Sequence, residues 1–260
     1  MAQDIALVTG ASSGIGEALA RRLARDGRQL ALVARRADRL EALAHELAEK
    51  HGVTAHVLAK DLTAPGAIGA LLADLGRRGL TVDWLVNNAG FGTAGRFDQL
   101  PIERELDEVR LNVEALVELT GRCLPGMVAR RRGLVMNIAS VGGFMPGPFM
   151  ATYAATKAFV LSFTEALAAE MRGTGVEVLC VCPGFTRTEF QGKADVDVAG
   201  VPGFAWMSAD EVADQAVRAV GRGPVLVNGF MNTMMTGALR FVPRRVTSWA
   251  VAAILRPKPA

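Results

Sequence analysis

Side chains of the kinds that often carry catalysis are scarce in this chain of 260 residues. It has three His, three Cys and a single Tyr, Tyr153. The histidines all lie within residues 45–56, and Cys123, Cys180 and Cys182 show no ligand-like spacing. These counts argue against a zinc site, a disulfide framework and any mechanism that depends on a histidine elsewhere in the chain.

The chain also lacks a large charge imbalance, a long apolar run and a secretion signal. Its net charge is only +3, so nucleic acid is not the expected partner. No apolar run approaches the roughly 20 residues that a membrane-spanning helix needs. The first four residues, Met-Ala-Gln-Asp, lead straight into a strand-like segment without the regions of a signal peptide, so we expect a cytoplasmic, reducing location.

Short runs rich in Val, Leu and Ile alternate with longer segments of helical period, a pattern typical of βαβ units around a parallel sheet. The expected strands cover residues 5–8, 30–33, 53–58, 84–86, 134–138, 176–181 and 225–227. The expected helices cover residues 16–25, 36–50, 65–78, 104–127, 154–172 and 209–221. We therefore predict α/β architecture: a single Rossmann-like, doubly wound domain with a seven-stranded parallel sheet flanked by helices.

We expect this domain to span residues 1–238 and to include an irregular loop at 185–207, rich in Gly, Pro and aromatic residues. A long loop that leaves the carboxyl end of a strand suits a substrate lid, and a loop without fixed structure is the alternative. Residues 239–260 form a predicted basic amphipathic extension. Peripheral contact with an anionic membrane through residues 239–258 is one role for such a helix, and packing on the domain body or on another subunit is the other.

A glycine-rich turn, Thr-Gly-Ala-Ser-Ser-Gly-Ile-Gly, follows the first expected strand at residues 9–16 and leads directly into a helix. Free backbone N–H groups and the positive end of the helix dipole would then point to one place, which suits an anion. The spacing is G-x-x-x-G-x-G, which differs from the common dinucleotide fingerprint. Taken alone, the three glycines could simply permit a tight turn and close helix packing.

Four further motifs follow in order: Asn-Asn-Ala-Gly at residues 87–90, Ser140, Tyr-Ala-Ala-Thr-Lys at 153–157 and Pro-Gly at 183–184. With these motifs the chain resembles the short-chain dehydrogenase/reductase family, from about Asp4 to Gly229. The resemblance implies a nicotinamide cofactor lying across the carboxyl ends of the strands, with its pyrophosphate on the glycine loop.

The resemblance also implies which residues contact the cofactor. Asp61 matches the residue that accepts a hydrogen bond from the adenine amino group, and Lys157 should reach the nicotinamide ribose. The full expected set is Gly10, Ser12, Ser13, Gly14, Ile15, Gly16, Arg35, Arg36, Asp61, Leu62, Asn88, Ala89, Gly90, Tyr153, Lys157, Pro183, Gly184, Thr186 and Thr188.

The end of the second expected strand decides between NAD and NADP. An NAD enzyme usually has Asp or Glu there for the ribose 2′-hydroxyl, whereas this chain reads Val33-Ala34-Arg35-Arg36. A guanidinium can form charge-assisted hydrogen bonds to a 2′-phosphate, which a carboxylate would repel. We therefore predict NADP(H). The alternatives are an NAD-preferring dehydrogenase and two arginines that merely begin a solvated helix.

Tyr153 and Lys157 are four residues apart on an expected helix, so their side chains share one face. An ammonium beside a phenol lowers its pKa, which would let Tyr153 act as a general acid or base without a histidine. The resemblance implies that Ser140 hydrogen-bonds the substrate oxygen and that the backbone carbonyl of Asn112 holds a water in a proton relay. An ordinary side-chain hydrogen bond is the alternative for Asn112.

The residues expected to face the substrate are Ser140, Gly142, Phe144, Phe149, Phe185, Phe190 and Trp206. They are mostly apolar and include no clamp for a carboxylate or phosphate, although several could instead pack in the core or in a subunit interface. We predict a metal-free NADP(H)-dependent oxidoreductase that interconverts a hydrophobic ketone and its secondary alcohol, such as a 3-oxoacyl, steroid-like or other lipid-like compound. A non-catalytic dinucleotide sensor or scaffold is the alternative. The resemblance further implies a homodimer or homotetramer, formed through the helices at 104–127 and 154–172.

Overall fold

The computed structural model describes residues 3–194, 201–239 and 241–254. Residues 195–200 of the expected substrate loop, and residues 240 and 255–260 of the expected extension, lie outside the described residues.

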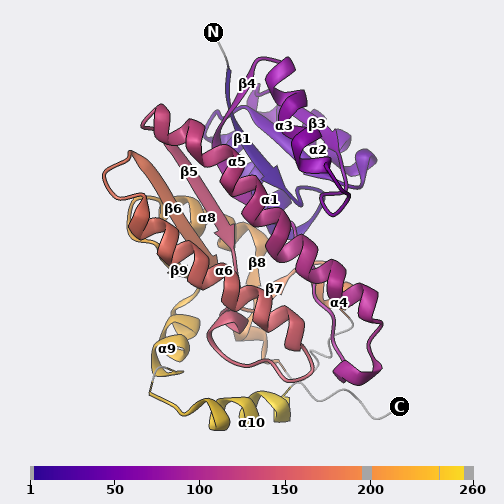
Figure 1. Cartoon of the computed structure of the whole chain (residues 1–260), viewed down its shortest axis with the longest axis vertical. Coiled ribbons are helices and arrows are strands. Elements are labelled where there is room, and N and C mark those ends of the chain that lie inside the picture. The colour runs from indigo at the N-terminus through magenta and orange to yellow at the C-terminus, as the bar shows by residue number, and fades with distance from the viewer. Residues whose placement is uncertain (1–2, 195–200, 240, 255–260) are drawn as a thin grey trace.

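A seven-stranded sheet forms the centre of the domain, with the strand order β3-β2-β1-β4-β5-β6-β9 (Figure 1). Its strands are β1 (Gln3–Thr9), β2 (Leu30–Ala34), β3 (Ala55–Ala59), β4 (Leu80–Asn87), β5 (Gly133–Ile138), β6 (Val176–Cys182) and β9 (Val225–Val227). Neighbouring strands are parallel throughout. The chain reverses its direction of winding between β1 and β4, so the predicted doubly wound sheet is confirmed.

Helices cover both faces of the sheet. One face carries α1 (Gly14–Arg25), α2 (Ala37–His51) and α8 (Ala209–Arg218), and the other carries α3 (Ala67–Arg77), α5 (Ala115–Ala129) and α6 (Ala151–Glu170). Along β1, Ala6 and Val8 pack with the first group, whereas Ile5 and Leu7 pack with the second. Successive side chains of a strand point to opposite faces, which is why strands buried on both sides read as continuous apolar runs.

The helix predicted at 104–127 is interrupted. The structure has α4 (Ile102–Val109), a π turn (Arg110–Glu114) and then α5. Apolar spacing does not reveal a single widened turn, because the segments on either side keep helical period. Such turns often occur at functional sites, and this one contains Asn112.

The loop after β6 is pinned at both ends by a short parallel pair, β7 (Thr186–Arg187) and β8 (Met207–Ser208). Within it lies α7 (Phe190–Ala194), and beyond β9 come α9 (Phe230–Leu239) and α10 (Arg244–Ile254). The last two helices lie at the end of the molecule toward which β5 points (Figure 1). Across the described ranges, no helix has the length and apolar character needed to cross a bilayer.

Candidate active site

The glycine loop joins β1 to α1 in a conformation that requires glycine. Gly10 and Gly14 have φ of 66° and 59°, in the left-handed region that other residues rarely adopt. A Cβ added to Gly16 would lie 2.3 Å from Asn88 Nδ2 and 2.4 Å from the carbonyl oxygen of Gly10. The loop can therefore approach the chain after β4 only because these positions lack side chains.

Thr9 fastens this loop to the Asn-Asn-Ala-Gly segment. Its hydroxyl donates to the carbonyl of Val86 at 3.2 Å and accepts from the backbone N–H groups of Asn88 and Ala89, each at 2.9 Å. Ser13 precedes α1, and its side chain makes no capping hydrogen bond, so the Ser13 hydroxyl does not occupy the N–H groups at the helix N-terminus. This cradle fits an anionic group such as a pyrophosphate.

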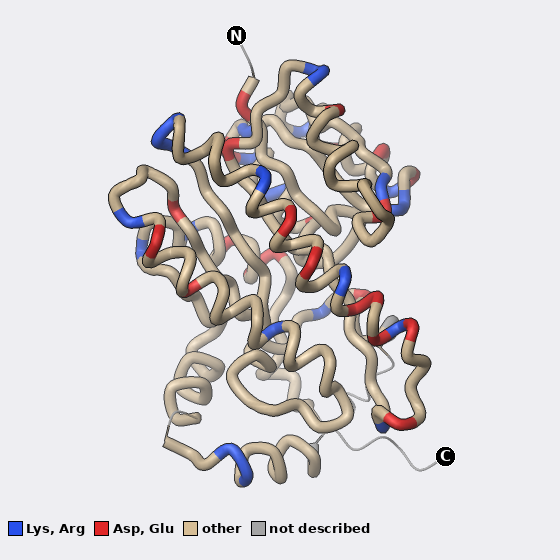
Figure 2. Tube along the Cα trace, viewed as in Figure 1, with Lys and Arg blue, Asp and Glu red and all other residues tan. Residues whose placement is uncertain are grey.

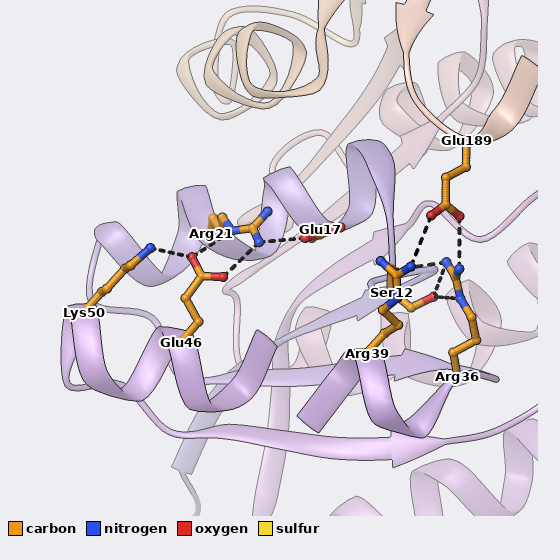
Figure 3. Close-up of polar contacts among 8 residues, drawn as sticks. All are labelled: Ser12, Glu17, Arg21, Arg36, Arg39, Glu46, Lys50 and Glu189. Carbon is orange, nitrogen blue, oxygen red and sulfur yellow. Dashed lines mark hydrogen bonds and ion pairs between the residues drawn. The ribbon is translucent and has the colours of Figure 1, made fainter. Parts of the chain in front are cut away.

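Arg36 brings a guanidinium to the same loop (Figure 3). Its Nε and Nη2 atoms donate to the Ser12 hydroxyl at 3.2 Å, and Nη2 also donates to the Ser12 carbonyl at 3.1 Å. Nη1 pairs with Glu189 at 3.0 Å. Arg35 is exposed and lies close enough to Asp61 to help lower the pKa of that carboxyl. Of the two arginines, Arg36 is therefore the one bound to the glycine loop.

Asp61 follows β3 and is held by its neighbour Thr63. Its carboxylate accepts the Thr63 hydroxyl at 2.7 Å and the Thr63 backbone N–H at 3.0 Å, and these hydrogen bonds are the main reason its pKa is lowered. Leu62 is buried beside it. Asp61 is thus an ionised acceptor near the carboxyl end of β3, and its hydrogen bond with the adenine amino group stays a prediction.

The segment after β6 reaches both the glycine loop and the turn after Ser140, one of the candidate catalytic residues. The Pro183 carbonyl accepts from the backbone N–H of Val141 at 2.9 Å. A Cβ on Gly14 would lie 3.0 Å from the methyl group of Thr188. The Thr186 hydroxyl donates to the Gly184 carbonyl at 3.1 Å, which fixes the intervening turn. The predicted cofactor segments therefore converge along one edge of the sheet.

Ser140, Tyr153 and Lys157 lie close together at this edge. Ser140 follows β5, and its hydroxyl accepts from the backbone N–H of Gly142 at 3.0 Å. Lys157 is buried, and its ammonium donates to the Ile138 carbonyl at 2.9 Å. The Lys157 Nζ atom lies 5.7 Å from the centre of the Tyr153 ring, and burial lowers the pKa of Lys157 to about 8.

The pKa of Tyr153 departs from the sequence-based expectation. We predicted that the neighbouring ammonium would lower it, but burial instead raises the pKa of the phenol to about 12. A hydrogen bond with Ser140 opposes this rise, and the charge of Glu108 adds to it. In the protein alone, desolvation therefore outweighs stabilisation of the phenolate, and Tyr153 is a neutral proton donor.

Asn112 uses its side chain to join three segments. Its amide oxygen accepts from the Phe91 backbone N–H at 3.1 Å, and its amide nitrogen donates to the Phe91 carbonyl at 2.9 Å and to the Thr156 hydroxyl at 3.1 Å. A Cβ on Gly90 would lie 2.8 Å from the Asn112 amide oxygen. The side chain thus has the structural role that we kept as the alternative, and the relay role of the backbone carbonyl stays a prediction.

The expected substrate residues do not all lie at one place. The Phe190 ring packs on Tyr153 with centroids 5.2 Å apart, and Phe185 packs on Trp206 at 5.5 Å. Phe149 has a left-handed φ of 65°, and its carbonyl accepts from the Gly95 backbone N–H at 2.8 Å. Phe144 packs against a buried cluster formed by α5, α6 and β6, so it contributes to the core as well as to this edge.

The family of this chain follows from comparison with known proteins. The family model described as short chain dehydrogenase matches residues 4–198. The chain belongs to this family. Among relatives of this short-chain dehydrogenase, a very-long-chain 3-oxoacyl-CoA reductase from Anas platyrhynchos is 35% identical over 188 residues, which cover 71% of this chain and 60% of that protein.

Solved structures give the same result over nearly the whole length. A short-chain dehydrogenase from Sphingobium yanoikuyae in complex with NADPH is 36% identical, with a TM-score of 0.83, covering 99% of this chain and 98% of that one. The bulky-bulky ketone specific alcohol dehydrogenase from Comamonas testosteroni is 30% identical, with a TM-score of 0.77, covering 100% and 97%. This chain is therefore an oxidoreductase with the short-chain dehydrogenase fold.

The sequence reasoning missed a pair of buried carboxyl groups in this short-chain dehydrogenase. Glu105 and Glu108 lie on α4, and both are buried. Glu105 accepts from the hydroxyl of Thr152, the residue before Tyr153. Because Glu105, Glu108 and Asn112 are spaced by three and four residues, they share one helix face toward α6. In the sequence, the only indication of this pair was that the acidic residues have the spacing of the buried face of a helix.

Proposed function

We propose that this protein is an NADP(H)-dependent oxidoreductase that interconverts a hydrophobic ketone and a secondary alcohol. The position of Gly142 carries the proposal, because a Cβ there would lie 3.4 Å from the Ser140 hydroxyl and 3.8 Å from the Tyr153 ring atom Cε1. The hydroxyl and the phenol therefore share one small space. Two hydroxyl groups so placed can both bond to a single carbonyl oxygen and stabilise the negative charge that develops on it.

The cofactor would bind across the glycine loop and the carboxyl ends of the strands. The cradle formed by Gly10, Gly14 and Gly16 would hold its pyrophosphate, and Asp61 would accept from its adenine amino group. Arg36 supports NADP over NAD, because its guanidinium lies on the glycine loop and Ala34 supplies no carboxylate. When bound, the nicotinamide supplies or accepts the hydride.

In the reducing direction, Tyr153 donates its phenolic proton to the substrate oxygen, and in the oxidising direction it removes that proton. Ser140 donates a hydrogen bond to the same oxygen and orients it. Lys157 stabilises the phenolate that forms, and with a pKa of about 8 it can exchange a proton near neutral pH. We further propose that the Asn112 carbonyl holds a water that extends this exchange to solvent.

Apolar side chains support a hydrophobic substrate. Phe190 lies on Tyr153, and the Phe185–Trp206 pair lies on the segment that follows the catalytic edge. The relatives named for 3-oxoacyl-CoA and for bulky-bulky ketones point the same way. We propose a lipid-like or aromatic ketone as the substrate class.

Two exposed apolar residues support a homo-oligomer. Val117 on α5 is 37% exposed and Phe159 on α6 is 42% exposed, and these helices are the ones expected to pair subunits. We also retain the cytoplasm as the proposed location, and residue 238 as the boundary between the catalytic domain and its extension.

A cofactor oxidation assay tests the proposed function. Purified protein is mixed with NADPH or NADH and a panel of ketones that ranges from short polar compounds to 3-oxoacyl thioesters, steroids and aryl ketones. We expect NADPH consumption with at least one hydrophobic class and a clear preference over NADH. If no ketone in the panel causes cofactor consumption, the dinucleotide sensor becomes the favoured function. Faster consumption of NADH than of NADPH would overturn the cofactor assignment.

A further inference from the structure

The helix α9 presents three methionines to solvent, while its one buried residue is polar. Met231, Met234 and Met235 are 63%, 60% and 41% exposed. Thr236 on the opposite side is only 4% exposed, and its hydroxyl donates to the Asn232 carbonyl at 2.9 Å. A surface helix normally has the reverse arrangement, with its apolar stripe toward the core.

The helix α10 shows the same inversion. Val246 is 53% exposed and Trp249 is 75% exposed, and Ala250 and Ala253 extend the same exposed stripe at helical spacing. Thr247 is buried, with its hydroxyl donating to the Arg244 carbonyl at 2.9 Å. Two consecutive helices that expose apolar stripes indicate a surface that something covers.

We call this surface the α9–α10 face. Its large exposed apolar residues are Phe230, Met231, Met234, Met235, Phe241, Val246 and Trp249. The face lies at the end of the molecule that holds the candidate active site, since α9 packs against the 3₁₀ turn Val141–Phe144 that follows Ser140.

The charge of the chain is divided sharply near this face. Residues 230–260, from the start of α9 onward, contain five Lys or Arg and no Asp or Glu, so they carry +5 and leave −2 for the residues before them out of the net +3. Arg244 and Arg245 are exposed at the start of α10. In Figure 2 the start of α10 is basic, and neither α9 nor α10 carries an acidic residue.

We propose that the α9–α10 face binds the surface of an anionic lipid bilayer. Apolar side chains that include an aromatic ring and methionines can enter the boundary between head groups and acyl chains, while nearby arginines attract acidic head groups. A symmetric contact with the same face of a second copy is disfavoured, because it would bring two cationic segments together. Bound in this way, the protein would have its active-site end close to the membrane.

Vesicle flotation with the full chain, without cofactor or substrate, tests this proposal independently of catalysis. We expect binding to vesicles of phosphatidylcholine and phosphatidylglycerol in equal parts, much weaker binding to phosphatidylcholine alone, and weaker binding as salt is raised. The double variant Arg244→Gln/Arg245→Gln should lower the partition coefficient by about tenfold or more. Val246→Ser/Trp249→Ser should lower it without changing the charge.

Matched control variants test whether lipid binding is specific to the α9–α10 face. Arg77→Gln/Arg78→Gln removes two cations from the end of α3, and Phe97→Ser/Ile102→Ser removes two residues that are 57% and 53% exposed outside the face. Both should float like the original chain, and circular dichroism should show unchanged helix content. Equal flotation of all variants would overturn the proposal, as would no flotation at all. Self-association that Val246→Ser/Trp249→Ser abolishes, without lipid binding, would assign the face to a second copy instead.

Discussion

The hydroxyl oxygen of Thr93 lies 3.0 Å from Oε2 of Glu108. The same hydroxyl lies 2.5 Å from Glu105, and its one proton can be donated to only one of the two carboxyl groups. The second contact therefore needs a proton on a carboxyl. Burial raises the pKa of Glu108 to about 7, and the nearby charge of Glu105 adds to the rise, while Thr93 and Lys157 oppose it. Glu108 is thus the group that holds this proton.

Replacing Glu108 by Gln should change how stability depends on pH. Between the ordinary pKa of 4.5 and the raised value of about 7, the native state binds a proton that the unfolded state lacks, so stability falls as pH rises through this window. The shift corresponds to about 3 kcal/mol. Because Gln cannot ionise, Glu108→Gln should gain stability relative to the original chain by up to that amount between about pH 5 and about pH 8.

Urea unfolding at the two pH values measures this difference. The control is Glu103→Gln, which makes the same substitution at an exposed residue of the same helix, and the gain between the two pH values should be larger for Glu108→Gln. An equal gain in the two variants would show that Glu108 does not hold the proton.

Because Tyr153 is the single tyrosine of the chain, the titration of its phenol can be measured directly. A free phenol is half ionised near pH 10, whereas burial raises the pKa of Tyr153 to about 12. Near-ultraviolet absorbance near pH 10 should therefore show a neutral phenol in the native protein and a partly ionised one in urea. Glu108→Gln should shift the native titration to lower pH, because the Glu108 charge is one cause of the rise. Matching titrations in native and unfolded protein would refute the burial of this phenol.

Tyr153→Phe tests the proton donor itself. The change removes only the phenolic oxygen, so we expect turnover to fall by at least ~10²-fold while NADPH binding, followed by its fluorescence, stays close to normal. Phe163→Tyr is a useful partner in the same helix, since it restores the tyrosine count without placing a hydroxyl beside Ser140. The mechanism fails if Tyr153→Phe keeps near-normal turnover.

The sheet could be predicted from the sequence because its central strands are buried on both faces, while only the edge strands β3 and β9 are partly exposed. Runs such as Leu30-Ala31-Leu32-Val33 contain no polar residue, and the helices between the strands show clear apolar spacing. The π turn around Asn112 could not, because one widened turn leaves that spacing intact on either side. The orientation of α9 and α10 could not be predicted either, since periodicity indicates an apolar stripe without showing whether it faces the protein or the solvent.

The site was predictable where its residues follow strand ends. Thr9 ends a parallel strand, and four other residues follow such strands within two positions: Asp61, Asn88, Ser140 and Pro183. The carboxyl ends of these strands meet at one edge. Electrostatic environments were not predictable in the same way. The raised pKa of Tyr153 and the proton shared near Glu108 depend on burial from several elements, and a linear spacing does not give burial.

Cofactor preference should depend on the arginine bound to the glycine loop. Arg36→Asp removes the guanidinium that lies on Ser12 and places a carboxylate near the proposed 2′-phosphate, so we expect the NADPH/NADH preference in kcat/KM to fall by about tenfold or more. Arg35→Asp should lower it too, in line with its place at the end of β2. Lys50→Asp makes the same charge change at the far end of α2 and should leave the preference unaltered. An unchanged preference in both arginine variants would sink the NADP assignment.

Gly90 tests how closely the chain after β4 must approach the π turn and α6, which hold Asn112 and Lys157. A Cβ there would lie 2.8 Å from the Asn112 amide oxygen and 3.6 Å from Lys157 Nζ. Gly90→Ala should therefore push on the Asn112 amide and cost about 1–3 kcal/mol of stability, with lower turnover. Gly76→Ala, in the last turn of α3 with no neighbouring atom within 4 Å of the new Cβ, should instead stabilise by up to about 0.5–1 kcal/mol. Urea unfolding compares each variant with the original chain. If Gly90→Ala is as stable as the original chain, the Asn112 amide can move aside without a loss of stability.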